Sequence, residues 1–169
     1  MAAPLATAGI EIRIARPADA EALATLRYRF RHELGRAVES EGSFVARCAA
    51  WMLTRLGADS AWRCWVAENG TRIVAQVWVE YFEKIPNPVA EPERHAILTN
   101  FFVEPELRNA GLGARLLRTA LEACAAAGVD AVLLRPSDRS RPFYLRHGFA
   151  PAESYFVREA PRPSPSSAE

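Results

Sequence analysis

The sequence predicts a single domain of mixed α and β structure. Its 169 residues are the size of one ordinary domain, and half of them are apolar, which is enough to bury a core without disulfides. Stretches with the alternation of β-strands and stretches with helical spacing follow one another along the chain. An Asn-Gly pair between two alternating runs indicates a β-hairpin.

The first half of the chain holds a strand, two helices and the hairpin. Residues 10–15 alternate as a strand does, and Pro17 then sets the first turn of a helix that extends to about Leu34. A second helical pattern runs from residue 44 to residue 56. Two β-branched and aromatic runs fill residues 62–82, and we place their turn at Asn69-Gly70, which tolerates positive φ.

The second half continues the alternation of strands and helices. Residues 95–103 predict a strand, and leucines at helical spacing predict a helix from residue 112 to about Gly128. The apolar run 129–135 predicts another strand, and a short helix passes through Phe143. A last strand is expected at 155–160. We therefore expect one domain over residues 1–160, followed by a disordered, Pro/Ser-rich tail at 161–169.

Composition argues against several classes of protein. The chain has 21 basic and 20 acidic residues, a formal net charge of +1, so it has no bulk attraction to nucleic acid or to a membrane. Cys48, Cys64 and Cys124 are far apart and have no histidine cluster beside them, so we expect no disulfide framework and no metal. With no apolar segment of membrane-spanning length, we expect a cytoplasmic protein.

Gly111 and Gly113 stand where a predicted strand gives way to a helix. A helix N-terminus presents free N–H groups and about half a positive charge, and missing Cβ atoms let an anionic ligand approach those groups. Arg108 adds a full charge at the rim. Leu116 stands where a dinucleotide fingerprint needs its third glycine, and no Gly-Lys-Ser/Thr follows, so the two common nucleotide loops are absent. The alternative is a tight turn with a close helix–sheet contact.

Two blocks of sequence carry a resemblance to a known family. Residues 108–113 read Arg-Asn-Ala-Gly-Leu-Gly, and residues 144–149 read Tyr-Leu-Arg-His-Gly-Phe. In their order and spacing they resemble the pyrophosphate loop and the later tyrosine block of the GNAT superfamily, the Gcn5-related N-acetyltransferases. The resemblance covers essentially residues 10–156.

The resemblance implies an α/β fold of the α+β type. A mixed, mostly antiparallel sheet of six to seven strands would carry helices on both faces, with the fourth and fifth strands splayed to admit acetyl-CoA. The arm of the cofactor would pair with the fourth strand, and main-chain N–H groups after it would hold the pyrophosphate. The cofactor-binding residues implied are Phe101, Phe102, Val103, Arg108, Asn109, Ala110, Gly111, Leu112, Gly113, Ala114, Ser137 and Tyr144.

The implied reaction is acetyl transfer from acetyl-CoA to a primary amine of a small molecule or protein, by direct attack in a ternary complex. Tyr144 matches the family tyrosine that donates a hydrogen bond to the leaving thiolate. Asn100 is a candidate to bind the substrate or the carbonyl oxygen. Strand alternation predicts that Thr99 and Asn100 face opposite sides of the sheet, so that one of them at most faces the thioester.

The chain departs from the family pattern where a general base often stands. Ile97 and Thr99 occupy those places on the fourth strand, and neither side chain accepts a proton. Glu80 on the preceding strand is the first candidate to replace the base, with His95 and Glu104 as the others.

Several alternatives stay open from the sequence. The missing base favours an acyl-CoA sensor that has the GNAT fold without catalysis, and the glycine loop also suits an ATP- or NAD-dependent enzyme. Arg135, Arg139, Arg141 and Arg146 form a basic cluster, of which we expect one to bind the CoA 3′-phosphate. We expect acidic residues between 31 and 43 to attract a cationic amine or to be surface charges. The apolar, Trp-bearing third strand suggests a homodimer.

Overall fold

The computed structural model describes residues 7, 9–91 and 93–152. The chain forms two compact units, Met1–Arg135 and Pro136–Glu169, and each is described by itself. The predicted strand at 155–160 and the tail at 161–169 lie outside the described residues. The prediction of one domain over residues 1–160 stays a prediction.

The first unit is built on a five-stranded sheet whose strands lie in the order β1-β2-β3-β4-β5. The first four strands pair antiparallel, whereas β5 runs parallel to β4. Their bounds are β1 Ile10–Ile14, β2 Trp62–Asn69, β3 Arg72–Glu83, β4 Arg94–Val103 and β5 Ala131–Leu133. The predicted fold class is confirmed, with five strands in the described residues where six to seven were expected.

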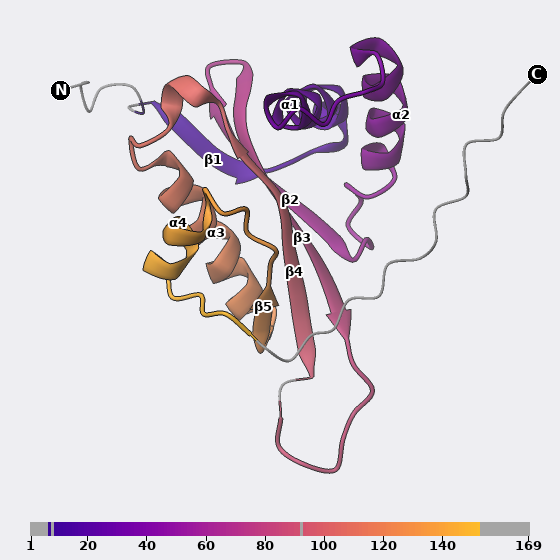
Figure 1. The fold of residues 1–169 in the computed structure, drawn as a ribbon. Coiled ribbons are helices and arrows are strands. Elements are labelled where there is room, and N and C mark those ends of the chain that lie inside the picture. The colour runs from indigo at the N-terminus through magenta and orange to yellow at the C-terminus, as the bar shows by residue number, and fades with distance from the viewer. Residues whose placement is uncertain (1–6, 8, 92, 153–169) are drawn as a thin grey trace, which may run out of the picture. The chain divides into compact units, whose positions relative to one another are not determined.

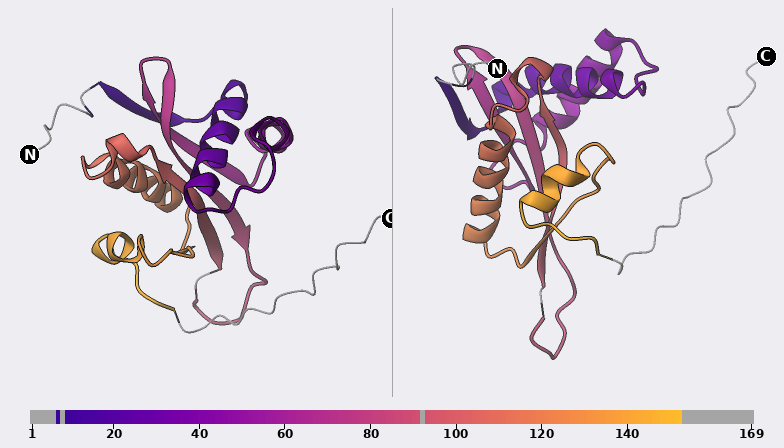
Figure 2. Two further views of the ribbon diagram at one scale, coloured as in Figure 1. Left: turned by 45° about the horizontal axis from the view of Figure 1, so that its top comes forward. Right: turned by 60° about the vertical axis from the view of Figure 1, so that its left-hand side comes forward.

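Helices cover both faces of this sheet. Figures 1 and 2 show α1 (Ala20–Glu33) and α2 (Glu41–Leu53) on one face and α3 (Leu112–Ala126) on the other. Two short 3₁₀ turns, η2 (Pro17–Asp19) and η3 (Pro105–Leu107), precede α1 and α3. Between β3 and β4, the connection 84–91 extends beyond the end of the sheet (Figure 1).

The core of this unit lies on both sides of the central strand β3. Toward α1, the fully buried Gln76 donates a 3.1 Å hydrogen bond from its amide to the carbonyl oxygen of Leu23 and accepts one of 2.9 Å from the Trp78 indole. Trp78 itself is 1% exposed. Leu116 and Leu117 of α3 are also fully buried. The apolar residues of β3 that suggested a homodimer are therefore accounted for by this core.

The β2–β3 hairpin forms as predicted, but its turn is displaced by one residue. Asn69 pairs with Arg72 in the ladder, so the two loop residues are Gly70 and Thr71. Of the hairpin residues, Gly70 has a positive φ of 63°, and Asn69 does not. The turn therefore needs one left-handed residue at its first position, as a glycine-first hairpin turn does.

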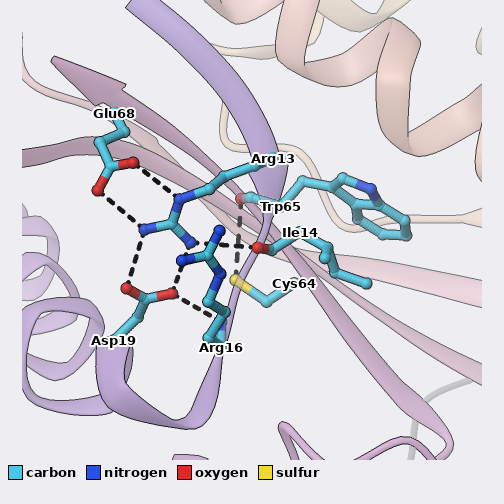
Figure 3. Close-up of polar contacts among 7 residues, drawn as sticks. All are labelled: Arg13, Ile14, Arg16, Asp19, Cys64, Trp65 and Glu68. Atoms are coloured by element: carbon cyan, nitrogen blue, oxygen red, sulfur yellow. Dashed lines mark hydrogen bonds and ion pairs between the residues drawn. The ribbon is translucent and has the colours of Figure 1, made fainter. Parts of the chain in front are cut away.

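An ion cluster fastens the start of the unit. Arg13 on β1 lies between Asp19 and Glu68, with nitrogen–oxygen distances of 2.7 and 3.0 Å to the first and 2.8 and 2.9 Å to the second (Figure 3). Asp19 also accepts the Arg16 backbone N–H at 2.6 Å. The side chains of Arg13 and Asp19 are largely buried. Three segments, β1, the start of α1 and β2, are thus joined through one guanidinium.

The second unit is described as far as residue 152. Its helix α4 (Arg141–Arg146) begins after Ser137, whose carbonyl oxygen accepts the N–H groups of Ser140 and Arg141 at 3.0 and 2.9 Å. The Tyr144 ring packs against Phe143 and Phe149, with centroids 5.3 and 5.5 Å apart. The short helix predicted through Phe143 is confirmed.

Candidate active site

A bulge in β4 shapes the site. Thr99 pairs with Trp78 and Phe102 with Gln76, so two residues of β4, Asn100 and Phe101, oppose the single residue Val77. Asn100 has a positive φ of 48°. A β-bulge of this kind re-aims side chains and disturbs the alternation along the strand.

The bulge brings Thr99 and Asn100 to the same pocket. This pocket has a volume of about 410 Å³ and lies on the α1 and α2 face of the sheet. Both residues line it, so the prediction that they face opposite sides is wrong. The physical reason is the extra residue in β4, which cancels the strict period of two on which the prediction relied.

The walls of the pocket are mainly aromatic. Trp51 of α2, Trp62 of β2 and Trp78 of β3 contact one another, with ring centroids 5.4, 6.0 and 6.2 Å apart. Phe44 of α2 adds a fourth ring. A pocket of this size, apolar with a few polar groups, is typical of a small-molecule site.

The main charged group of the pocket is Arg27 of α1. Its Nη1 donates to the Asn100 side-chain oxygen at 3.1 Å, which links α1 to the bulge. Burial, followed by the nearby charge of Arg31, lowers the pKa of Arg27. Cys48 also lines the pocket, and burial raises the pKa of its thiol, so Cys48 is not an activated nucleophile.

The ladder between β4 and β5 is short. It joins His95 to Ala131, Ala96 to Val132 and Ile97 to Leu133. The ladder ends at Ile97 because β5 ends at its partner Leu133, whereas β4 continues to Val103. The splaying expected between the fourth and fifth strands stays a prediction.

The glycine loop follows β4 and opens α3. Gly111 has a φ of 82° and precedes the helix, and the first helical bond runs from the Arg115 N–H to the Gly111 carbonyl at 3.1 Å. Helix geometry leaves the N–H groups of Leu112, Gly113 and Ala114 without acceptors in the helix. A Cβ added at Gly111 would meet nothing within 4 Å. Protein atoms therefore leave open the space beside Gly111, and the donor groups suit a diphosphate.

Arg108 has a different environment from the one expected. Its Nη1 and Nη2 form ion pairs of 2.7 and 2.6 Å with Glu33 at the end of α1, and its Nε donates to the Val103 carbonyl at 2.8 Å. The guanidinium also lies 5.3 Å from the centre of the Phe102 ring. Its charge is thus neutralised by Glu33, and the side chain joins α1 to the end of β4.

The three candidate bases have different surroundings. Glu104 is 3% exposed and its two oxygens lie 2.9 and 2.6 Å from Arg29 and Arg72, so both oxygens already have partners within the chain. His95 packs edge-on against Phe82, four residues before Thr99. Glu80 pairs with Trp62 of β2 and Ile97 of β4. It follows Trp78 by two residues, so its side chain lies on the same side of β3, the side that faces the pocket.

The remaining predicted residues belong to the second unit. Burial raises the pKa of Tyr144 to about 12. The Ser137 hydroxyl lies 2.9 Å from that of Ser140, and the Ser137 N–H donates to Ser140 Oγ at 2.9 Å. Ser137 therefore has a local part in the turn that starts α4.

Two of the acidic residues expected to attract a cationic amine have partners within the chain. Glu33 is bound by Arg108, and Glu39 accepts from Arg47 at 2.6 Å. What the sequence analysis missed is Arg27 and the tryptophan-lined pocket. The signal available was the concentration of tryptophans in residues 51–78, which by itself indicates only a core.

Two kinds of feature are absent from the part of the chain that the structure describes. There, no three His, Cys, Asp or Glu side chains gather as metal ligands would. No helix in the same residues is long and apolar enough to cross a bilayer.

Comparison with known proteins agrees with this architecture. The family model described as the acetyltransferase (GNAT) family matches residues 20–149. A GCN5-related N-acetyltransferase from Ralstonia eutropha JMP134 is 26% identical with a TM-score of 0.75, covering 89% of this chain and 99% of its own. A predicted acetyltransferase from Clostridium acetobutylicum, solved with acetyl-CoA, is 21% identical with a TM-score of 0.76, covering 89% and 96%.

A third structure, glucosamine-6-phosphate N-acetyltransferase from Arabidopsis thaliana, is 17% identical with a TM-score of 0.66, covering 89% of this chain and 97% of its own. At the identities of the second and third structures, the likeness is one of fold. The family model, by contrast, spans most of the sequence, including the glycine loop and the tyrosine block. The chain belongs to the acetyltransferase (GNAT) family.

Proposed function

We propose that the protein transfers the acetyl group of acetyl-CoA to a primary amine by direct attack in a ternary complex. The observation that carries the proposal is the course of β4. The strand continues past the end of β5 after Ile97, lines the pocket with Thr99 and Asn100, and ends before the glycine loop and the N-terminus of α3. A cofactor held at that loop and along this edge would bring its thioester to the pocket. The acetyl-CoA in the Clostridium relative supports this choice of donor.

The chain offers fitting groups for acetyl-CoA. The N–H groups of Leu112, Gly113 and Ala114 would hold the diphosphate, because no side chain caps them and a Cβ added at Gly111 would meet no described atom within 4 Å. Main-chain groups from Phe101 to Val103 would hold the arm. Arg108 would act indirectly, by fixing the Val103 carbonyl and the end of β4. When bound, the cofactor supplies an acetyl carbon already activated as a thioester.

The side chains then divide the work of acyl transfer. Glu80, through a water molecule, takes the proton that the amine loses as its nitrogen bonds to the acetyl carbon. Asn100 binds the acceptor or the acetyl oxygen. The carbon–sulfur bond breaks, and the Tyr144 hydroxyl donates a hydrogen bond to the departing thiolate. With a pKa raised to about 12, the phenol stays protonated and serves as a donor, because complete proton transfer to a thiolate of pKa about 8.5 is strongly uphill.

The test is thiol release from acetyl-CoA with a panel of amines and peptides. We expect release that depends on an amine and on Glu80, with Glu80→Gln slowing it at neutral pH. An acyl-CoA sensor would bind CoA in calorimetry and release no thiol with any amine. Binding of ATP or NAD without binding of CoA would favour a nucleotide-dependent enzyme and would contradict the proposal.

We also propose that the protein acts in the cytoplasm, without nucleic acid or membrane as a partner. Cys64 and Cys124 are buried free thiols, and Cys48 is a half-buried one, which suits a reducing compartment. The near-neutral net charge of +1 supports a small-molecule partner. Fractionation of the producing cells would test the location.

A further inference from the structure

The pocket holds a positive charge that has no counter-charge among the described residues. In the part of the chain that the structure describes, Arg27 forms no ion pair, and its contacts are the Asn100 amide oxygen at 3.1 Å and the Phe30 ring at 5.7 Å. A guanidinium has five N–H donors, so most remain for a ligand. Burying such a group without a partner is unfavourable, as its lowered pKa reflects.

The rest of the pocket does not neutralise this charge. No acidic side chain of the described residues lines it. The other lining cation, Arg47, already has Glu39 as a partner at 2.6 Å. The field inside the pocket is therefore positive, and it is centred on a planar fork of donors that matches a carboxylate.

The aromatic walls define the other half of the ligand. Trp51, Trp62, Trp78 and Phe44 surround a volume of about 410 Å³, enough for an amino-acid-sized molecule with an apolar body. Thr99 and Asn100, where we place the thioester, line the same pocket as Arg27. A molecule whose anionic group bound Arg27 would thus have its other groups near the bulge of β4.

We infer that the acceptor is a small primary amine that carries a carboxylate and an aromatic or large apolar body, as an aromatic amino acid does. Arg27 binds the carboxylate and the tryptophans bind the body. The amine is then directed at the acetyl group. This inference rests on the proposed function for the chemistry, although the carboxylate site itself can be tested without turnover. It favours free amino acids over protein N-termini, which lack the adjacent carboxylate.

The first experiment measures binding alone. Calorimetry compares N-acetyl-L-phenylalanine with N-acetyl-L-phenylalaninamide, two molecules that differ in the carboxylate and cannot be acetylated at nitrogen. We expect the carboxylate to bind about tenfold or more tightly, the usual size of a hydrogen-bonded charge pair. In Arg27→Gln the dissociation constants of the two compounds should lie within about twofold of each other, while Arg27→Lys should keep part of the preference for the carboxylate.

The second experiment measures turnover. We expect the kcat/KM for thiol release to be about tenfold or more higher with L-phenylalanine than with L-phenylalaninamide or 2-phenylethylamine, and the preference to vanish in Arg27→Gln. Arg118→Gln is the matched control, because it removes one exposed cation from the opposite face of the sheet and should leave the ratio unchanged.

The outcomes separate this inference from the proposed function. Thiol release that ignores the carboxylate, or a carboxylate preference that survives Arg27→Gln, would overturn the inference and leave acetyl transfer standing. Arg27-dependent binding of N-acetyl-L-phenylalanine without thiol release from any amine would support the carboxylate site and remove the proposed function. Thermal unfolding of Arg27→Gln near the wild-type temperature shows that a lost preference comes from the site and not from unfolding.

Discussion

Arg13 and Arg27 are both partly buried, yet of these two only Arg13 has carboxylate partners among the described residues. Arg13 donates hydrogen bonds to Glu68 and Asp19, which raise its pKa, and Figure 3 shows the two carboxylates on either side of its guanidinium. Burial lowers the pKa of Arg27, which contacts an amide oxygen. The first arrangement holds three segments together, while the second leaves donors directed into a pocket. We therefore assign the neutralised Arg13 to the scaffold and Arg27 to the proposed site.

The same difference recurs in other polar groups of the first unit. Glu104 is bound by Arg29 and Arg72, and Glu33 by Arg108, so these charges belong to the scaffold. The first N–H groups of α3 have no acceptor in the helix and no capping side chain. With Arg27, they are the groups to which we assign a ligand.

The largest effect is expected when a side chain covers the N–H groups at the N-terminus of α3. Gly111→Val should weaken CoA binding about 100-fold or more, because the side chain covers N–H groups that each contribute about 1.5–3 kcal/mol toward a charged ligand. Its φ of 82° adds strain of about 1–2 kcal/mol for any residue with a Cβ. Titration calorimetry with CoA measures the change.

Gly128→Val is the control for this strain. Gly128 follows the other end of α3 with a φ of 71°, and its added Cβ would meet the end of the flexible Arg94 side chain at 3.3 Å. We expect comparable destabilisation with normal CoA affinity. Equal loss of affinity in both variants would mean that the backbone strain acts on the whole helix and that Gly111 marks no site.

The next effect is a difference in folding stability between variants of Arg13 and Arg27. Arg13→Met should lower the free energy of unfolding by about 2 kcal/mol, because it leaves the mostly buried Asp19 without its cation. Arg27→Met should change it by less than about 0.5 kcal/mol, since it removes a charge that has no counter-charge. Urea denaturation of the three proteins measures this, and an equal loss in both variants would contradict the distinction we draw.

A smaller effect concerns the second unit. Tyr144→Phe should lower kcat about tenfold with CoA affinity nearly unchanged, because the lost hydrogen bond is made to the leaving thiolate. Since burial raises the pKa of Tyr144 to about 12, the phenol should stay protonated, and the wild type should show no loss of kcat from this group below about pH 10. Steady-state kinetics test both points. Unchanged turnover with a large loss of affinity would assign Tyr144 to binding.

The smallest effect is the acid dependence of the Arg13 cluster. Burial alone would raise the pKa of Asp19, but the hydrogen bonds from Arg13 and from the Arg16 backbone outweigh it and lower the pKa; the Arg13 hydrogen bond also lowers that of Glu68. A lowered folded-state pKa gives stability that is complete above the unfolded values of about 4 and is lost as pH falls through the folded ones.

The urea midpoints of the wild type and Arg13→Met should therefore differ most at pH 7 and converge from about pH 4 downward. The difference in urea midpoint between the wild type and Arg27→Met should stay the same over this pH range. A wild-type to Arg13→Met difference that stays constant from pH 7 to pH 3 would mean that the carboxylates contribute nothing through Arg13.

Sequence periodicity was sufficient for most of the fold and for the glycine loop. Both depend on local patterns, such as the leucines of α3 and the positive φ that Gly111 accepts. The β4 bulge was beyond that reasoning, because an extra residue is defined by pairing with β3 and Asn100 alone is a weak indicator of left-handed backbone. The difference between the charged partners of these arginines could not be predicted for the same reason. Whether a carboxylate lies beside Arg13, Arg27 or Arg108 depends on segments far apart in the sequence.

The most direct test of the account is a crystal structure of the protein with coenzyme A. We predict the diphosphate on the N–H groups of Leu112, Gly113 and Ala114, the arm along β4, and the sulfur beside Thr99 and Asn100. Coenzyme A bound elsewhere, or a glycine loop filled by atoms of the protein itself, would contradict it.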